Sequence, residues 1–326
     1  MQKNLVKYIL DNGGYIAPLI IPFEFTNGTG LMNPSVMIKN GKVIVIIRHV
    51  NYTFYHSEKK LFQHPYGPLT YIHPENDVHL RTWNWYCELS NEFRIEKFCK
   101  IDTAKFDIYD PLWDFIGLED ARIIEWDNKI FISGVRRDTT TNGQGRMELS
   151  EIKISESTVE EVNRTRIELS TNPDSYCEKN WMPIIDMPFH YIKWTNPTEL
   201  VKVDYQIGLS KTVSIGNSIN LPRDIRGGSQ LIPFDDGYFA VTHEVDLFQS
   251  EANRKDAVYY HRFVVWDKQF NITKVSQEFH FMDADVEFCI GLAEYEDNYI
   301  MTFGFQDNAA YIIKCPKSFI KNFIFS

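Results

Sequence analysis

The chain has 326 residues, of which 44% are hydrophobic and 14% aromatic, a composition typical of a globular protein with a substantial core. Its 34 lysines and arginines against 44 aspartates and glutamates give a formal net charge of −10, which argues against nonspecific nucleic-acid binding. The five cysteines form no CxxC pair, so the sequence indicates neither a zinc site nor a disulfide framework.

Residues 1–30 form an N-terminal segment that is expected to close or pack on the fold that follows. Its apolar stretch from Tyr15 to Phe23 is interrupted by Pro18 and Pro22, so it matches neither a signal peptide nor a membrane span. Scattered cysteines are typical of free thiols in a reducing compartment. The protein is therefore predicted to be cytoplasmic, without stable membrane insertion.

A strand, a turn and a second strand recur along the chain, with a polar residue at each end of the unit. In four of the five copies, nearly the same number of residues separates the opening residue from the closing one. The copies run from Asn33 to Arg48, from Asp120 to Arg136, more loosely from Glu178 toward Trp194, from Gly228 to His243, and from Gly291 to Asp307.

Two segments lie outside these units. Residues 56–113 are predicted to be an insertion near the functional site, because they are dense in histidine, proline and aromatic residues. Aromatic rings interleaved with hydrogen-bonding groups suit sugars, although any single ring is equally explained as core of an outer strand. Residues 311–326 are expected to close the fold as a strand or as a short amphipathic helix.

Fixed spacing within the units and variable gaps between them predict an all-β fold, a five-bladed β-propeller formed by residues 1–326 as a single domain. A β-sandwich with polar hairpin ends is the alternative. In a propeller the opening and closing residues meet at one mouth of the central channel, where we expect the active site and where Asp120 and Arg136 would meet. The residues predicted at this mouth are Asn33, Arg48, Asp120, Arg136, Lys179, Asn180, His243 and Asp307.

The order of these motifs resembles that of the five-bladed mannoside phosphorylases of glycoside hydrolase family 130 and the related β-1,2-mannosyltransferases of glycosyltransferase family 108. The resemblance covers about residues 31–310. It is carried by Asn33-Pro34-Ser35 with Arg48, by Gly117-Leu118-Glu119-Asp120-Ala121-Arg122, by Glu178-Lys179-Asn180-Trp181-Met182-Pro183, and by residues 227–243 and 288–307. Ala121 stands where proline is usual in the family.

The resemblance implies roles for individual residues. The aspartate of the family's Glu-Asp-Pro-Arg motif is the general acid, which corresponds to Asp120 here. Basic residues at the other blades bind phosphate, which assigns Arg48, Lys179 and His243, with Arg136 added, to a phosphate or donor group. Sugar contacts are expected from Asn33, Asn180, Asp307, Glu119 and Asn51. No metal or other cofactor is expected, because the histidines show neither HxxxH nor HExxH spacing.

One carboxylate among several cations fits phosphate better than water, because a hydrolase needs a second carboxylate about 6.5–9.5 Å from the acid. Glu119 and Glu287 are the candidates for that second carboxylate. The favoured hypothesis is a glycosyltransferase that builds a glycan by inverting mannosyl transfer, from GDP-mannose or mannose 1-phosphate to an oligosaccharide acceptor. The alternatives are a mannoside phosphorylase that degrades β-mannosides and a noncatalytic glycan-binding propeller.

Overall fold

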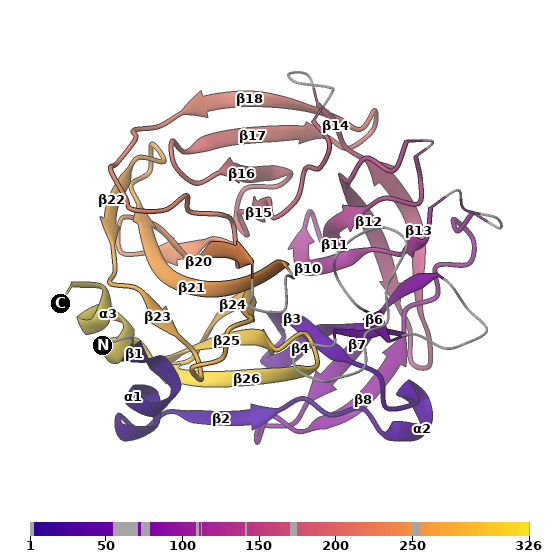
Figure 1. Ribbon diagram of the computed structural model, residues 1–326, viewed down its shortest axis with the longest axis horizontal. Coiled ribbons are helices and arrows are strands. Elements are labelled where there is room, and N and C mark those ends of the chain that lie inside the picture. Colours follow the sequence, from indigo (N-terminus) through magenta and orange to yellow (C-terminus); the bar gives the residue numbers. More distant parts are fainter. Residues whose placement is uncertain are drawn as a thin grey trace.

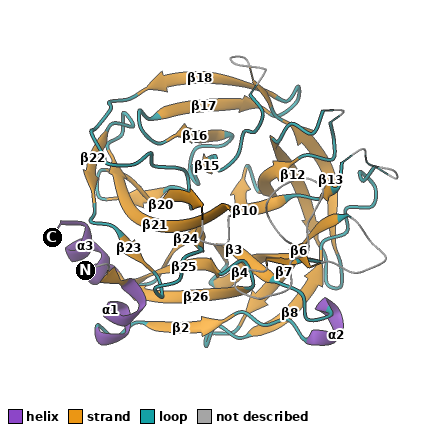
Figure 2. Ribbon diagram, viewed as in Figure 1, coloured by secondary structure: helices purple, strands orange, loops and turns teal. Residues whose placement is uncertain are grey.

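The computed structural model describes residues 3–54, 71–72, 79–108, 111, 113–140, 142–169, 175–249 and 255–325. Five mainly antiparallel sheets surround a central channel (Figure 1). In each sheet the main series of consecutive strands runs from the innermost strand outward, and three sheets gain an outer strand from an earlier part of the chain. Strands account for most of the described residues, and the helices lie at the rim (Figure 2). The predicted five-bladed β-propeller is confirmed.

Blades 1 and 2 contain regular up-and-down strands. Blade 1 consists of β3 (Leu31–Lys39), β4 (Lys42–Val50), β7 (Leu80–Leu89) and β8 (Ile95–Lys100), with β9 (Phe115–Ile116) parallel to β7. The short strands β5 (Thr53–Phe54) and β6 (Tyr71–Ile72) pair only with each other in the described part of the chain. Blade 2 consists of β10 (Glu119–Trp126), β11 (Lys129–Arg136), β12 (Arg146–Ile154) and β13 (Val159–Arg166).

Blades 3 to 5 are less uniform in strand length. Blade 3 consists of β15 (Met182–Pro183), β16 (His190–Trp194), β17 (Glu199–Asp204), β18 (Leu209–Ile215) and the parallel edge strand β14 (Glu168–Leu169). Blade 4 consists of β19 (Ile232–Phe234), β20 (Gly237–Gln249), β21 (Lys255–Trp266), β22 (Ile272–Val275) and β23 (Phe279–His280). Blade 5 consists of β24 (Glu287–Tyr295), β25 (Asn298–Phe305) and β26 (Ala309–Pro316).

The N-terminal segment completes the last two blades. Strand β2 (Tyr15–Pro18) is the outer strand of blade 5, and β1 (Lys3–Asn4) pairs with β23 of blade 4. Between them α1 (Leu5–Asp11) begins at Asn4, whose side chain accepts a hydrogen bond from the Lys7 amide at 2.9 Å. The short helix α2 (Phe23–Thr26) follows β2, and α3 (Lys317–Phe325) forms the C-terminal end and packs in the same apolar cluster as α1.

The described residues form six apolar clusters, of which five lie between neighbouring blades, one at each junction, and the sixth lies in blade 1 around Val50 and Tyr52. Strands packed between two neighbouring blades are therefore buried on both faces, and such a strand can be a continuous apolar run instead of an alternating one. Residues 43–47 of β4 show this, because all five side chains are at most 4% exposed. The repeated apolar strands in the sequence are thus explained by blade-on-blade packing.

The predicted insertion at 56–113 is narrower than its sequence suggested. Residues 80–89 and 95–100 are strands of blade 1, and Trp85 lies in its core with 6% of its surface exposed. Residues 55–70, 73–78, 109–110 and 112 of this segment lie outside the described residues. The described aromatic side chains at 85 and 98 are thus part of blade packing, as the alternative explanation held.

Polar side chains tie the blades together around the channel. Ser35 Oγ donates to the Ala121 carbonyl at 2.7 Å, and Gln230 Nε2 donates to the Val36 carbonyl at 2.7 Å. Arg122, which is 1% exposed, reaches from blade 2 to the Gly228 carbonyl of blade 4 at 2.7 Å. Because blades 2 and 4 are not neighbours, this contact links the two blades across the channel.

Two features outside the channel complete the description. No helix in the described part of the chain is long and apolar enough to cross a lipid bilayer. All five cysteines are free thiols, as the sequence predicted, and three of them are buried, namely Cys87, Cys289 and Cys315.

Candidate active site

Irregular backbone at the start of the inner strands places two predicted site residues against each other. Asn33 and Asp120 have positive φ angles of 45° and 53°, and in both strands the pairing register shifts at that point, which marks a β-bulge. Asn33 Nδ2 donates to Asp120 Oδ1 at 2.8 Å. A Cβ atom at Gly304 would lie 2.1 Å from Asn33 Oδ1, so glycine is required beside this amide.

Arg48 holds the Asp120 carboxylate from the other side. Its Nη1 lies 2.9 Å from Asp120 Oδ1, and its Nη2 lies 3.3 Å from Glu119 Oε2 and donates to the Tyr52 hydroxyl at 2.9 Å. Burial alone would lower the pKa of Arg48, but Tyr52, Glu119 and Asp120 raise it well above its usual value. The mouth therefore contains a permanently charged, 6% exposed cation.

Asp120 is ionised in this arrangement. Burial would raise the pKa of its carboxyl group, but the charge of Arg48 and the hydrogen bond from Asn33 lower it below the ordinary value. Arg122 does not pair with this carboxylate: its Nη1 donates to the main-chain carbonyl of Asp120 at 3.1 Å. The acid predicted from the sequence thus lies in a cation-rich pocket, but its proton is absent in the ligand-free state.

Asp307 is a second carboxyl group at the mouth, with the opposite tendency. It follows β25 in a left-handed conformation with a φ of 48°. Burial, together with the charges of Asp120 and Glu119, raises its pKa to about 6, although the charges of Arg48 and Lys179 lower it in part. Asp307 is therefore within electrostatic range of Arg48 and Asp120, and the two aspartates of the mouth have pKa values shifted in opposite directions.

Lys179 and His243 lie on the blade 3 and blade 4 sides of the mouth. The exposed Lys179 ammonium forms no ion pair within 4 Å in the described part of the chain, yet its charge lowers the pKa values of Asp307 and His243. His243 is 2% exposed, and its Nδ1 is 2.8 Å from the Gly227 carbonyl. Burial, His261 and Arg226 lower its pKa well below 6.5, so the ring is neutral and presents Nε2 as an acceptor.

Arg136 does not join Asp120, and this sequence prediction is wrong. Its Nε lies 3.0 Å from Glu148 Oε2 and its Nη1 lies 3.5 Å from Asp138 Oδ2, while the side chain is 2% exposed. Asp138 Oδ2 also accepts a hydrogen bond from the Gly117 amide at 3.3 Å. Arg136 is therefore part of a buried ion-pair network that supports the segment before Glu119.

Three further residues were predicted to contact the sugar, namely Asn51, Asn180 and Glu119. The Asn51 side chain is used within blade 1, because its Nδ2 donates to the His79 carbonyl at 3.0 Å and its Oδ1 accepts from the Arg81 amide at 2.7 Å. Asn180 has a φ of 63°, which repeats the left-handed backbone of Asn33 and Asp120 in blade 3. Glu119 pairs with Arg48.

Glu287 is not a free second carboxylate. Its side chain is 0% exposed and accepts backbone hydrogen bonds from Phe281 and Met282 at 2.6 Å and from Ala284 at 3.2 Å. Burial raises its pKa to about 7 although these amides lower it. Glu287 therefore organises the loop before β24, and its fixed hydrogen bonds leave it no role in activating water.

Two tyrosines at the mouth were missed in the sequence. Tyr52 accepts the hydrogen bond from Arg48, and Tyr259 stacks on His243 with a centroid distance of 5.6 Å. Phe288 lies edge-on to the same imidazole ring at 4.6 Å. Neither tyrosine belongs to a recognisable motif, and only the strand pairing that brings β20 beside β21 reveals the second one.

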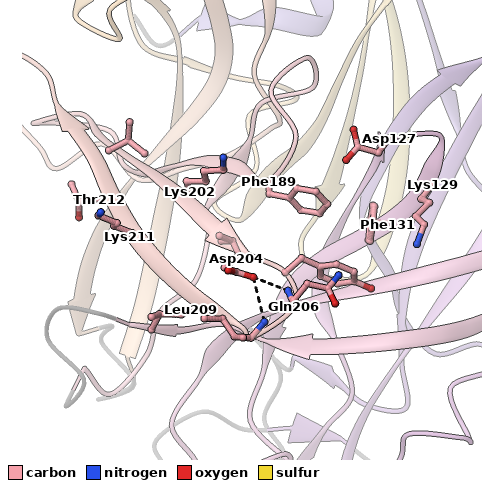
Figure 3. Close-up of a pocket in the computed structure, with 14 residues that line it drawn as sticks. Asp127, Lys129, Phe131, Phe189, Lys202, Asp204, Gln206, Leu209, Lys211 and Thr212 are labelled. Atoms are coloured by element: carbon pink, nitrogen blue, oxygen red, sulfur yellow. Dashed lines mark hydrogen bonds between the residues drawn. The ribbon is translucent and has the colours of Figure 1, made fainter.

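A large pocket of about 910 Å³ opens elsewhere, between blades 2 and 3 (Figure 3). It lies at the β10–β11 and β17–β18 turns, at the ends of these strands opposite Asp120. Its charged groups do not converge on a ligand position, because Lys129 pairs with Glu151 and Asp204 accepts hydrogen bonds from the backbone of its own turn. The cluster around Asp120 is thus the better candidate site.

Among the described residues, no group of three histidine, cysteine, aspartate or glutamate side chains is arranged to hold a metal ion.

Comparison with known proteins gives a result at the level of structure alone. No family model matches the sequence. No curated protein matches it either. The fold, however, is similar to that of β-1,2-mannobiose phosphorylase from Listeria innocua in complex with β-1,2-mannobiose. The two chains are 14% identical with a TM-score of 0.57, covering 95% of this chain and 96% of the other.

Two further structures show the same architecture. A mannose phosphorylase from Leishmania mexicana in complex with phosphate is 11% identical, with a TM-score of 0.53 over 97% of this chain and 93% of the other. A structure from work on hydrolases of glycoside hydrolase family 130 that target β-1,2-mannosidic linkages in Candida mannan is 12% identical. Its TM-score is 0.57, over 89% of this chain and 85% of the other.

The fold is that of the five-bladed propeller enzymes that act on mannosides. The resemblance to glycoside hydrolase family 130 that the ordered motifs carried is confirmed at the level of the fold. The relation to glycosyltransferase family 108 stays a prediction.

Proposed function

We propose that the protein is a mannoside phosphorylase, which cleaves a β-mannoside with inorganic phosphate and releases mannose 1-phosphate. The observation that carries this proposal is the partly buried ion pair of Arg48 and Asp120 at the channel mouth. It joins an acid to a cation that suits phosphate. Similarity in fold to phosphorylases, one of them in complex with phosphate, favours this function over the synthetic transfer preferred from sequence.

Phosphate is proposed to bind between Arg48 and Lys179, with His243 at the same side of the mouth. A guanidinium group binds phosphate oxygens with two parallel hydrogen bonds, and the Lys179 ammonium adds a charge that no described carboxylate neutralises. Phosphate then competes with Asp120 for Arg48. Loss of that cation and arrival of a dianion both raise the pKa of Asp120, so phosphate binding would protonate the acid.

The protonated Asp120 would then act as the general acid. It donates its proton to the glycosidic oxygen while a phosphate oxygen attacks the anomeric carbon from the opposite face. The bond from the anomeric carbon to the leaving sugar breaks, and a bond from that carbon to phosphate forms. The leaving sugar keeps the proton, and the product is mannose 1-phosphate of inverted configuration. Asn33 fixes the Asp120 carboxyl through the 2.8 Å hydrogen bond.

Hydrolysis is supported less well by the same geometry. Water needs a carboxylate base at about 6.5–9.5 Å from the acid, whereas phosphate is already an anion. Glu287 is occupied by three backbone amides, and Glu119 is paired with Arg48. Asp307, with a pKa raised to about 6, is the carboxylate at the mouth best suited to act as a base, and release of free mannose would assign it that role. Because phosphate needs no such base, we assign Asp307 to contact with the sugar.

Synthetic mannosyl transfer is retained as the second candidate, because the reverse of phosphorolysis uses the same site with mannose 1-phosphate as donor. A GDP-mannose donor would also place two phosphates beside Arg48. A noncatalytic glycan-binding propeller is the third candidate, and it predicts sugar binding that does not depend on an ionisable Asp120.

One set of incubations separates these candidates. Wild-type protein receives β-1,2-mannobiose with phosphate in one arm, and mannose 1-phosphate or GDP-mannose with mannose, glucose or N-acetylglucosamine acceptors in the other arms. Asp120→Asn is expected to abolish turnover, whereas Asp235→Asn, in an exposed turn where Asp235 pairs with Lys321, keeps it. Turnover only with GDP-mannose would replace the proposal by synthesis. Sugar binding without any turnover would leave the noncatalytic function.

A further inference from the structure

The central hairpin of blade 4 is longer than its counterparts in blades 1 and 2. In blade 1, β4 ends at Val50, just after Arg48, and in blade 2, β11 ends at Arg136. In contrast, β20 continues past His243 to Gln249 and pairs with β21 along its whole length. The free end of this hairpin points toward the central channel in Figure 1. Residues after His243 therefore form a wall beside the mouth.

Tyr259 is rigidly held in this wall. Its backbone amide donates to the Asp285 carbonyl at 2.8 Å, and it pairs with Val245 across the hairpin. Its ring lies parallel to the His243 imidazole, with an interplanar angle of 10° and centroids 5.6 Å apart. Phe288 approaches the tyrosine ring at 6.3 Å. The orientation of the Tyr259 ring is thus fixed before any ligand binds.

No hydrogen bond to the hydroxyl of this half-buried tyrosine is found within the part of the chain that the structure describes. Two other tyrosines of the inner blades differ, because the Tyr52 hydroxyl binds Arg48 and the Tyr191 hydroxyl binds Ser133. Burial raises the pKa of Tyr259, and the charges of Asp307 and Asp120 raise it further. The group is therefore a protonated donor within electrostatic reach of both carboxyl groups.

We propose that Tyr259 is a sugar-binding residue of the mouth, whose hydroxyl donates a hydrogen bond to an oxygen of the glycosyl unit beside Asp120 and Asp307. A rigid ring with a free donor loses little entropy on binding, and a pyranose offers many acceptor oxygens. The identity of the sugar as a mannoside rests on the proposed function. The contact itself requires only a pyranose at this mouth.

Calorimetric titration of Tyr259→Phe tests this inference directly. The ligands are β-1,2-mannobiose and, in a separate titration, inorganic phosphate. Loss of one hydrogen bond to an uncharged ligand is expected to weaken mannobiose binding by about threefold to tenfold. Phosphate binding and the melting temperature are expected to stay unchanged. A phenylalanine variant that binds mannobiose within twofold of wild type would overturn the inference.

The matched control is Tyr260→Phe. Tyr260 is the next residue of β21, and its ring lies under the Arg223 guanidinium at 4.2 Å, on the other face of the sheet. This variant is expected to bind mannobiose like wild type. An equal loss of mannobiose affinity in both variants would show that the effect comes from a disturbance of β21 and not from the Tyr259 hydroxyl. Wild-type binding without phosphorolysis would refute the proposed function while the Tyr259 comparison still decides the contact. Absence of binding in the wild type would refute both.

Discussion

The opposite pKa shifts of the two aspartates at the mouth predict opposite effects on stability. The Asp307 carboxyl group has a folded pKa of about 6 against an ordinary value of 3.8. Its stabilising contribution is therefore complete below the unfolded pKa and is lost as the pH rises through 6. A shift of this size corresponds to about 3 kcal/mol, which partial exposure reduces to about 1–3 kcal/mol.

Above pH 6 the ionised Asp307 carboxylate destabilises the folded protein, and Asp307→Asn removes this destabilisation. Between pH 4 and pH 8, the difference in the free energy of unfolding between variant and wild type is expected to shift by about 1–3 kcal/mol in favour of the variant. At roughly 2 °C per kcal/mol for a chain of this size, the melting temperature would rise by about 2–6 °C. Thermal unfolding of both proteins at pH 4 and pH 8 measures this difference in melting temperature. Equal differences between the proteins at the two pH values would refute the reasoning.

Asp120→Asn is the control of opposite sign. The pKa of Asp120 is lowered, so its contribution is present above the unfolded pKa and is lost as the pH falls through the folded value. The asparagine variant is expected to be less stable than wild type at pH 8, with a smaller difference below pH 4. Stabilisation of both variants at pH 8 would show that the two carboxyl groups share one environment.

Other substitutions separate binding from structure. Lys179→Met is expected to raise the phosphate KM at least about tenfold in steady-state kinetics, with an unchanged melting temperature, because the lysine forms no described ion pair. Glu287→Gln is expected to lower the free energy of unfolding in urea by about 1–3 kcal/mol without changing KM, since it faces three amide donors. Arg136→Met is expected to cost about 3–5 kcal/mol by leaving Glu148 unpaired. Losses confined to activity in either of the last two variants would contradict these structural roles.

The blade pattern could be predicted because it depends on local sequence. Polar residues end each hairpin, and strands such as residues 43–47 are apolar throughout because both faces are buried. Residues 1–30 were expected to close or pack on the fold, but the strand pairing that closes the ring could not be predicted in this way. The pairing of β2 with β26 joins opposite ends of the chain, and the apolar and polar residues of 15–18 do not specify their partner.

The site was predictable where the repeat alone determines position. Asn33, Arg48 and Asp120 were expected at one mouth, and the structure places them in contact. Arg136 was predicted by the same argument but points to Glu148, because reaching the end of a strand does not determine the face on which a side chain lies. The β-bulge between Glu119 and Arg122 changes the face of the sheet on which the Asp120 side chain and those after it lie. No pattern in the sequence predicts this bulge.

The tyrosines required tertiary information. Tyr259 becomes part of the mouth only because β20 and β21 extend past His243, and an alternating strand sequence would look the same in an outer strand. The pKa shifts of Asp120 and Asp307 likewise depend on burial and on charges from different blades.

The most direct test of the central claim is ³¹P NMR of the wild-type protein with β-1,2-mannobiose and inorganic phosphate. The proposed function predicts that the phosphate signal decreases as a signal of mannose 1-phosphate of inverted configuration grows, and that Asp120→Asn shows no such conversion. Release of free mannose with an unchanged phosphate signal would contradict phosphorolysis and indicate that water is the nucleophile at this mouth.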